Sequence, residues 1–290
     1  MSEAPIGVFD SGMGGLTVLK ALLRRLPGED FVYLGDTARL PYGTKSPETV
    51  ARYALQAAEA LEAYRVKCLV IACNTASSVG LPIIQERIES VPVVGVIEPG
   101  ARAACEASSS GHIAVIATEG TVRGGAYQQA ILRLRPGARV TALPAPLFVS
   151  LAEEGLHTGS IAGAVARHYL RPIFGATDSA ESRPDTLVLG CTHFLMLAAS
   201  IRRAAGRGVR IVDSAATTAE AVEQGLSNAG LLRAGATGSF SGVPKSARKS
   251  SCTGGTVRFL ATDGIERFAR IGGGFLGRAI TPGEVELIDL

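Results

Sequence analysis

The sequence predicts a parallel α/β fold, and three observations carry that prediction. Short apolar runs recur along its 290 residues and end at small or polar residues, as buried strands do. The runs are apolar at successive positions, so both faces of each strand are expected to be covered, which is typical of parallel sheets. Longer helix-like segments separate the runs, and alternation of strand and helix indicates a parallel α/β architecture.

The expected strands are Ile6–Asp10, Phe31–Asp36, Cys68–Cys73, Val91–Ile97, Ile113–Ala117, Val140–Pro144, Thr186–Cys191 and Val209–Asp213. A helix is expected from Pro47 to Tyr64, because Ser46 suits its N-cap and proline suits the first helical position. The order of these elements predicts two units. Residues 1–97 together with about 208–290 form the first domain, and residues 98–207 form the second.

Composition limits the partners of the chain. Hydrophobic residues make up 47% and charged residues 19%, so the chain can bury a substantial core and is not disordered. The formal charge is +3, and Lys245, Arg248 and Lys249 lie together in a stretch rich in glycine and serine. The remaining body is nearly neutral, which argues against nucleic acid as a partner. The Gly238–Gly255 stretch is expected to be a solvated surface loop.

The cysteines and the apolar runs indicate the compartment. Five cysteines are widely spaced, and no basic leader precedes the first strand. The apolar runs are far shorter than the ~18 residues that a membrane helix needs. Reduced thiols in a cytoplasmic protein that does not enter the membrane are therefore expected.

The candidate chemistry lies where strands end. Parallel α/β sheets bind ligands outside the carboxyl ends of their strands, a rule that selects Asp10, Cys73 and Cys191. Hydrogen-bonding residues follow each of these cysteines, whereas Cys68 and Cys105 have the character of core residues. Cys252 falls in the glycine- and serine-rich stretch and is expected to be an exposed thiol.

Two thiols on opposite units suggest inversion of a carbon centre. A thiolate removes a proton from one face of a carbon acid while a thiol donates one to the other face, and no cofactor or metal is required. A free thiol has a pKa of ~8.5, so the site must favour the thiolate. Helix N-termini after the cysteines, with His193 or Asp10, would supply that help. A carboxylate-bearing small molecule suits the hydroxyl and amide groups nearby, those of Ser11, Asn74, Thr75 and Thr192.

The sequence supports three other kinds of site less well. The turn Gly12–Thr17 follows a strand, and Asp36 ends the next one, as in a dinucleotide-binding fingerprint. Thr17 replaces its third glycine, however, and Asp10 would face a pyrophosphate. Zinc is disfavoured because the sequence has no Cys-x-x-Cys pair and its four histidines are scattered. Cys191 and His193 are too close along the chain to form a good hydrolase pair.

Several motifs occur together and in a fixed order, and they are Gly7–Leu16, Leu34–Thr37, Pro41–Gly43, Ala72–Ser77, Ala117–Thr121, Glu153–Gly155, Gly190–His193 and Phe259–Asp263. In carrying this set, the sequence resembles the glutamate racemases. The resemblance implies a cofactor-independent racemase that interconverts L- and D-glutamate and supplies D-glutamate for peptidoglycan. It also implies two α/β domains related by a pseudo-twofold axis, an active site between them, and a homodimer.

The resemblance assigns roles to particular residues. Cys73 and Cys191 become the two acid/base groups, with Asp10 assisting Cys73 and His193 assisting Cys191. Glu153, which precedes a second glutamate, becomes a further assistant. Asp10 and His193 also border the substrate in this assignment. The other substrate-binding residues would be Ser11, Tyr42, Gly43, Asn74, Thr75, Thr121 and Thr192, with Thr118 as a secondary choice.

Three alternatives remain open at this stage. Aspartate racemases use the same two-thiol plan, but they typically have glutamate after the second Cys-Thr, where this chain has His193. A dicarboxylate isomerase could share the fold and act on substrates such as maleate. A binding protein could keep the pocket without catalysis, but that would need loss of a thiol, and both Cys73 and Cys191 are present.

Overall fold

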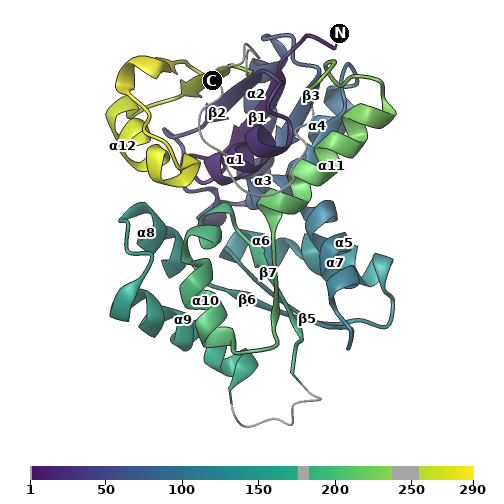
Figure 1. Cartoon of the computed structure of the whole chain (residues 1–290), viewed down its shortest axis with the longest axis vertical. Helices are drawn as coiled ribbons and strands as arrows, with labels where there is room; N and C mark the ends of the chain where they lie inside the picture. Colours follow the sequence, from purple (N-terminus) through teal and green to yellow (C-terminus); the bar gives the residue numbers. More distant parts are fainter. Residues whose placement is uncertain (1, 176–182, 237–254) are drawn as a thin grey trace.

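The computed structural model describes residues 2–175, 183–236 and 255–290, which form two α/β units stacked along the long axis of the molecule (Figure 1). The first unit, at the top of the view, contains both chain ends. The strands are β1 Ile6–Asp10, β2 Phe31–Gly35, β3 Cys68–Ile71, β4 Val93–Gly95, β5 His112–Ala117, β6 Arg139–Pro144, β7 Thr186–Gly190, β8 Arg210–Asp213, β9 Val257–Ala261 and β10 Val285–Leu287.

The helices alternate with these strands. They are α1 Leu16–Arg25, α2 Pro47–Glu62, α3 Asn74–Val79, α4 Leu81–Arg87, α5 Ile97–Ala107, α6 Glu119–Gly124, α7 Ala126–Leu134, α8 Leu147–Glu153, α9 Gly159–Phe174, α10 Ala198–Ala205, α11 Ser214–Asn228 and α12 Ile265–Leu276. Short 3₁₀ helices occur at Tyr42–Thr44, Thr192–Leu197 and Pro282–Glu284.

Two parallel sheets organise the units. The first has six strands in the order β10-β9-β2-β1-β3-β4, and the second has four in the order β6-β5-β7-β8. Every strand pair described in them is parallel. The segment β2-β1-β3-β4 repeats the order β6-β5-β7-β8, so β3 and β7 hold equivalent places. The two candidate cysteines therefore follow equivalent strands.

The predicted parallel α/β class is confirmed, and each expected strand is present with its ends shifted by a few residues. The expected helix is present too, with Ser46 as its N-cap accepting from the Thr49 N–H at 3.3 Å. The expected return to the first unit at about residue 208 is wrong by one strand, because β8 still pairs with β7 in the second sheet. Residues 238–254 of the expected surface loop, with Cys252, lie outside the described residues.

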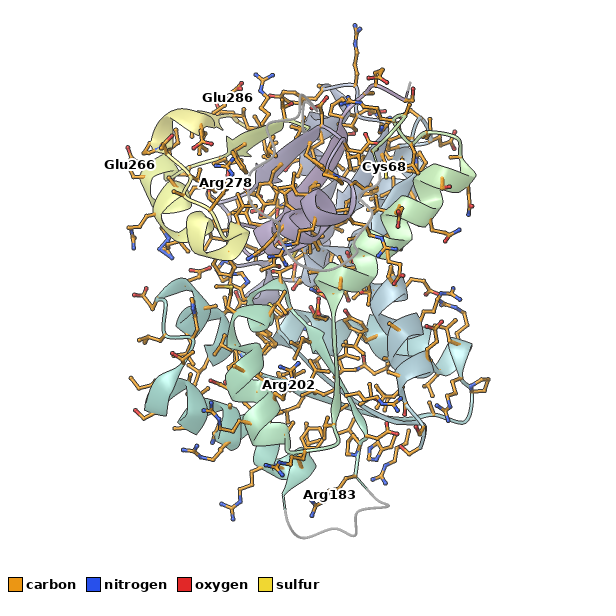
Figure 2. All side chains as sticks on the ribbon, in the orientation of Figure 1. Cys68, Arg183, Arg202, Glu266, Arg278 and Glu286 are labelled. Carbon is orange, nitrogen blue, oxygen red and sulfur yellow. The ribbon has the colours of Figure 1, made fainter. Side chains whose placement is uncertain are left out.

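Apolar packing joins the two units. One continuous cluster of buried side chains runs from Val8 and Leu16 in the first unit to Leu189 and Leu197 in the second. Helix α11 packs against α1 of the first unit and α5 of the second. Charged side chains such as Arg202 and Glu266 lie on the surface, whereas Cys68 is buried in the first unit (Figure 2). Within the described ranges, no helix combines the length and the apolar character needed to cross a membrane.

Candidate active site

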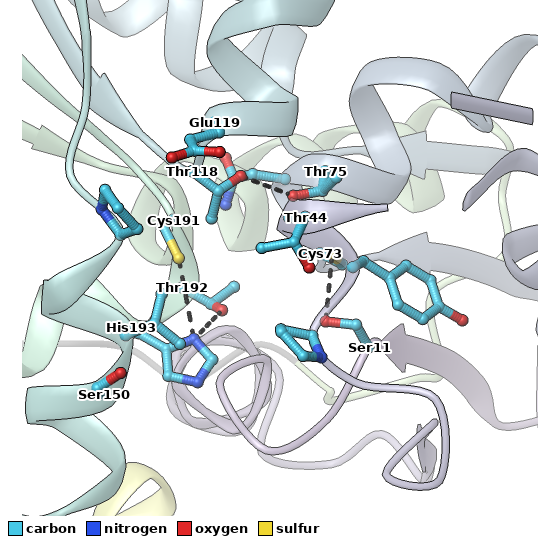
Figure 3. Close-up of a pocket in the computed structure, with 16 residues that line it drawn as sticks. Ser11, Thr44, Cys73, Thr75, Thr118, Glu119, Ser150, Cys191, Thr192 and His193 are labelled. Atoms are coloured by element: carbon cyan, nitrogen blue, oxygen red, sulfur yellow. Dashed lines mark hydrogen bonds between the residues drawn. The ribbon is translucent and has the colours of Figure 1, made fainter. Parts of the chain in front are cut away.

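A cavity of about 200 Å³ lies where the two units meet (Figure 3). Drug-sized ligands occupy pockets of roughly 300–1,000 Å³, so this one suits a smaller molecule. Both candidate thiols border it, one from each unit. The full lining is Ser11, Pro41, Tyr42, Gly43, Thr44, Cys73, Asn74, Thr75, Thr118, Glu119, Pro146, Val149, Ser150, Cys191, Thr192 and His193.

The first thiol stands at the junction of β3 and α3. The register pairs Phe9 with Ile71, which brings the ends of β1 and β3 to the same edge of the sheet. Cys73 is the N-cap of α3, and its Sγ accepts from the Ala76 N–H at 3.4 Å. A second hydrogen bond, 3.5 Å long, joins this sulfur to the hydroxyl of Ser11. The predicted helix N-terminus behind this cysteine is thus confirmed.

Asp10 lies behind Cys73 and not in the cavity wall. Its side chain is fully buried, and Oδ2 accepts from the Gly12 N–H at 3.0 Å. Oδ1 has no hydrogen-bond partner among the described residues. Burial raises the pKa of Asp10, against the opposing effects of His193 and of backbone N–H groups in the turn. A buried carboxylate with a free oxygen is suited to exchanging a proton with a neighbouring group.

Burial and the charge of Asp10 raise the pKa of Cys73 to about 12. The hydrogen bonds that Cys73 makes with Ser11 and Ala76 oppose this rise but do not cancel it. In the unliganded protein at neutral pH, Cys73 is therefore a protonated thiol, which is the form that donates.

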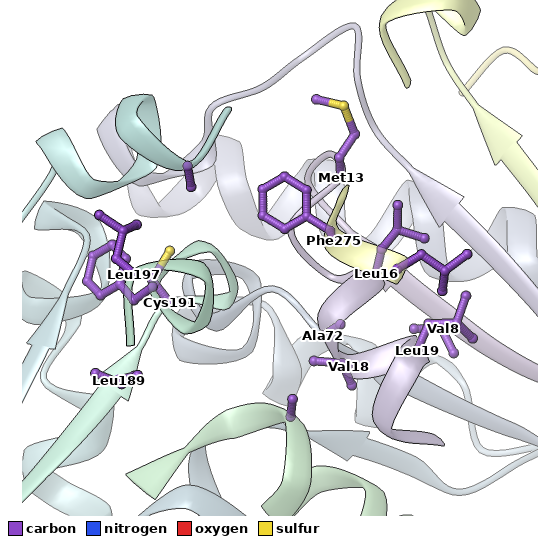
Figure 4. Close-up of a cluster of buried hydrophobic side chains, with 14 of the residues drawn as sticks. Val8, Met13, Leu16, Val18, Leu19, Ala72, Leu189, Cys191, Leu197 and Phe275 are labelled. Carbon is purple, nitrogen blue, oxygen red and sulfur yellow. The ribbon is translucent and has the colours of Figure 1, made fainter. Parts of the chain in front are cut away.

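The second thiol has a different setting. Cys191 follows β7 and is the N-cap of the 3₁₀ helix Thr192–Leu197, so a helix N-terminus follows this cysteine too, although the helix is 3₁₀ and not α. Its Sγ lies 3.8 Å from Nδ1 of His193, whose Nε2 lies 3.1 Å from Oε1 of Glu153. Leu189 and Leu197 lie near this cysteine in the core that the units share (Figure 4). Glu153, and not the adjacent glutamate, is the residue that contacts His193.

These contacts determine the charge of His193. Burial disfavours the imidazolium and lowers the pKa of His193, but hydrogen bonds to Cys191 and Glu153 outweigh that effect and raise it to about 10. An imidazolium therefore lies beside the sulfur of Cys191, whereas the carboxyl group of Asp10 lies behind that of Cys73. The two sulfurs thus have different surroundings.

Hydroxyl groups line the cavity between the thiols. Thr75 and Thr118 border it, and their Oγ1 atoms lie 2.9 Å apart. Thr121 does not border the cavity, but its hydroxyl lies 3.1 Å from that of Thr75 and 3.0 Å from that of Thr118. Tyr42 borders the cavity while its hydroxyl donates to Asp36 Oδ2 at 2.5 Å, so this hydroxyl anchors the loop that carries Gly43.

The structure gathers the predicted site residues in one place. Asp10, Glu153 and Thr121 stand behind the wall, and the secondary choice, Thr118, is part of it. The predicted residues that border the cavity are Ser11, Tyr42, Gly43, Cys73, Asn74, Thr75, Cys191, Thr192 and His193.

The glycine turn between β1 and α1 lies outside the cavity wall, since none of Gly12–Gly15 borders the cavity. Its backbone binds Asp10 instead, and Gly14 lies so close to Thr192 and His193 that a Cβ atom there would collide with both. The turn is a contact between the units and a support for Asp10.

Six lining residues were not predicted. Pro41 and Glu119 lie inside recognised motifs and Thr44 directly follows one, so neighbouring positions could have suggested them. The other three carry no signal in the sequence and were missed for that reason. They are Pro146, Val149 and Ser150, at the start of α8. Over the described ranges, no group of three or more His, Cys, Asp or Glu side chains is arranged to hold a metal ion.

Comparison with known proteins gives a consistent result. The family described as Asp/Glu/Hydantoin racemase matches residues 6–222. A glutamate racemase from Geobacter metallireducens is 46% identical over 285 residues, which cover 98% of this chain and 96% of that relative. These matches extend over both units.

Solved structures agree with the sequence comparison. Glutamate racemase isoform RacE1 of Bacillus anthracis superposes with a TM-score of 0.86 at 33% identity, covering 100% of this chain and 99% of that one. The glutamate racemase of Francisella tularensis, solved in complex with D-glutamate, superposes with a TM-score of 0.85 at 34% identity, covering 100% and 98%. The chain therefore belongs to the Asp/Glu/Hydantoin racemase family and is an amino-acid racemase similar to the glutamate racemases.

Proposed function

We propose that this chain interconverts L- and D-glutamate by a two-base mechanism in which Cys73 and Cys191 are the acid/base groups and no cofactor takes part. The observation that carries the proposal is the pairing of two buried thiols, from opposite units, on one small cavity. Each thiol has its own ionisable neighbour, Asp10 for Cys73 and His193 for Cys191.

In the first step the Cys191 thiolate takes the α-proton from one face of the substrate. The S–H bond forms as the Cα–H bond breaks, and the electron pair left on Cα spreads into the adjacent carboxylate. The His193 imidazolium lies beside this sulfur, with Nδ1 3.8 Å from Sγ. Hydrogen bonds to the developing charge, from hydroxyl groups such as those of Thr75 and Thr192, would stabilise it.

In the second step the Cys73 thiol donates its proton to the opposite face of Cα. The S–H bond breaks, the new Cα–H bond forms, and the centre is inverted. Cys73 is then the thiolate and Cys191 the thiol, so the same groups exchange roles when the other enantiomer binds. Asp10, buried beside Cys73 with a free oxygen, suits the proton exchange that restores the starting state.

Glutamate is the substrate that the comparisons favour. The similar relative and both similar structures are glutamate racemases, and one of them was solved with D-glutamate. The lining offers hydroxyls and the Asn74 amide to two carboxylates, and it includes no lysine or arginine among the residues described. We also propose that the D-glutamate serves peptidoglycan synthesis, as the family resemblance implies.

The test is incubation of the purified, metal- and pyridoxal-free protein with L-glutamate in D₂O. Optical rotation and deuterium at Cα are followed together in the wild type and in Cys73→Ser and Cys191→Ser. We expect the wild type to lose rotation while deuterium enters Cα. Each single variant should lose at least roughly 10²-fold in racemisation, the usual contribution of one acid/base group. Cys105→Ser is the matched control, because that thiol contacts Ile131 O, away from the cavity.

Two results would contradict the proposal. Inversion without deuterium at Cα would exclude exchange with solvent through the thiols. If the protein neither inverts glutamate nor exchanges its α-proton, glutamate is excluded as the substrate. The same assay would then be run with aspartate and with maleate.

A further inference from the structure

One carboxylate connects His193 to the opposite unit. Oε1 of Glu153 lies 3.1 Å from Nε2 of His193, and its Oε2 accepts from Nη2 of Arg267 at 2.7 Å. The side chains become more exposed along this path, from 9% at His193 and 14% at Glu153 to 42% at Arg267. Both oxygens of Glu153 are thus held, one from inside the site and one from its rim.

Arg267, the outer partner of Glu153, belongs to the other unit of the fold. Glu153 ends α8 in the second unit, whereas Arg267 lies in the first turns of α12, after strand β9 of the first sheet. Figure 1 shows α12 directly above α8 across the junction of the units. The same helix also touches His193 itself, since the ring of Phe275 meets the imidazole edge to face with centroids 5.2 Å apart. Helix α12 therefore supports His193 through two side chains.

The charges of His193 and Arg267 favour the ionised form of Glu153. Burial raises the pKa of Glu153, but hydrogen bonds and charge from His193 and Arg267 outweigh burial and lower it. An ionised Glu153 in turn supports the imidazolium of His193. On the other side of the cavity, the main influences on the pKa of Cys73 are burial, Asp10, Ser11 and Ala76, followed by Cys191.

We propose that Arg267 is a positioning residue for the reaction: it holds Glu153 in the orientation that keeps His193 beside Cys191, and so it sets the reactivity of Cys191 without touching the substrate. This role rests on the function proposed above and assigns a part of the machinery to α12. It predicts an asymmetric effect, because loss of Arg267 acts directly on the Cys191 side and reaches Cys73 only through the charges of His193 and Cys191.

The difference between the Cys191 side and the Cys73 side is measured by the reactivity of the two thiols. Wild type, Arg267→Gln, Arg267→Lys and Arg278→Gln are treated with iodoacetamide at neutral pH, and the rate of modification of each cysteine is read by peptide mass spectrometry. Arg278→Gln is the matched control, because it removes a similarly exposed arginine whose partner, Glu284, is remote from the cavity. Figure 2 labels this residue in the C-terminal part of the first unit.

In Arg267→Gln we expect Cys191 to react roughly threefold to tenfold more slowly, the range for a partly exposed, charge-assisted contact. Cys73 and Cys105 should keep their rates. Arg267→Lys keeps the charge and should recover part of the loss, and Arg278→Gln should match the wild type. The ratio kcat/KM should fall by the same factor in both directions, because the two enantiomers of the substrate have equal free energy.

Two outcomes would overturn the role of Arg267. An unchanged rate at Cys191 would show that Glu153 holds His193 unaided. Equal slowing of both cavity thiols would indicate a general change in access to the cavity. Alkylation needs no turnover, so selective slowing of Cys191 in a protein that does not racemise glutamate would support the positioning role while rejecting the proposed function.

Discussion

The charge of His193 is set by its surroundings, and this has a consequence for stability. The pKa of His193 in the folded protein is about 10. An unfolded chain gives histidine a pKa of ~6.5. Because the folded value is the higher one, protonation stabilises the fold, fully so below pH ~6.5. That contribution disappears as the pH rises through about 10.

We therefore expect His193→Asn to lose more stability at neutral pH than at high pH. Urea unfolding of wild type and variant at about pH 7 and about pH 10.5 measures the difference in the free energy of unfolding at each pH. The difference should be smaller at the higher pH, and a difference that grows with pH would contradict the assignment. The variant should also lose roughly 10- to 100-fold in racemisation, the scale seen when a group that orients a reactive ligand is removed.

Among the residues of the site, some carry a sequence signal and some do not. Cys73 and Cys191 were found because each follows an apolar strand in a parallel sheet, where ligands bind. Glu153 was suggested only by the resemblance, since nothing in its local pattern separates it from Glu154. Arg267 had no signal at all, because its contact with Glu153 depends on how two distant helices meet.

At the scale of elements, the turn between β1 and α1 fixes the approach of the two units. Gly14 packs against the start of the 3₁₀ helix that follows Cys191, and Thr17 donates to Thr192 O at 3.3 Å. A Cβ atom on Gly14 would lie 2.5 Å from Nδ1 of His193, closer than such atoms can stand. The absence of a side chain at this position therefore sets where His193 can lie.

Gly14→Ala should displace the imidazole from Cys191. We expect a loss of roughly 10²-fold in kcat, the effect of moving a catalytic group by about 1 Å. Gly12→Ala is the control in the same turn, since a Cβ atom there would meet Leu40 Cδ2 at an ordinary 3.4 Å. Racemisation assays of both variants, with circular dichroism to confirm folding, decide the point. Equal activity of the two would show that His193 tolerates the shift.

The elements that the sequence failed to predict share a physical reason. Interior parallel strands such as β1 and β7 are buried at every position and consist mostly of apolar residues, so they stand out in the sequence. Strand β9 begins with Val257 and the exposed Arg258, and β10 spans three residues of which two are exposed. Both strands lie at the outer side of the first sheet, where some of their side chains face water. Polar residues therefore interrupt the apolar run by which a strand is recognised in the sequence.

For the whole molecule, the position of the cavity between the units predicts closure around the substrate. Hydrogen bonds already cross the junction, including one from the Tyr127 hydroxyl to Asn74 Oδ1 at 2.8 Å. A ligand bound to both units adds contacts that only the closed arrangement makes. The homodimer implied by the family resemblance stays a prediction, and light scattering on the purified protein would test it.

Small-angle X-ray scattering with and without D-glutamate measures the closure. We expect a smaller radius of gyration in the complex, at a protein concentration where the oligomeric state is the same in both samples. Cys73→Ser serves as a control that blocks turnover and leaves both sides of the junction in place. Superimposable profiles would contradict closure.

The placement of β9 also affects how the protein is made. Strand β2 pairs on one side with β1 and on the other with β9, which lies more than two hundred residues further along the chain. Until Val257–Ala261 has left the ribosome, β2 carries an open edge in a strand whose residues are all buried in the finished protein. Open apolar edges of this kind recruit other chains. A polypeptide interrupted before β9 is therefore expected to aggregate, because the β2 edge that β9 covers in the folded protein stays open.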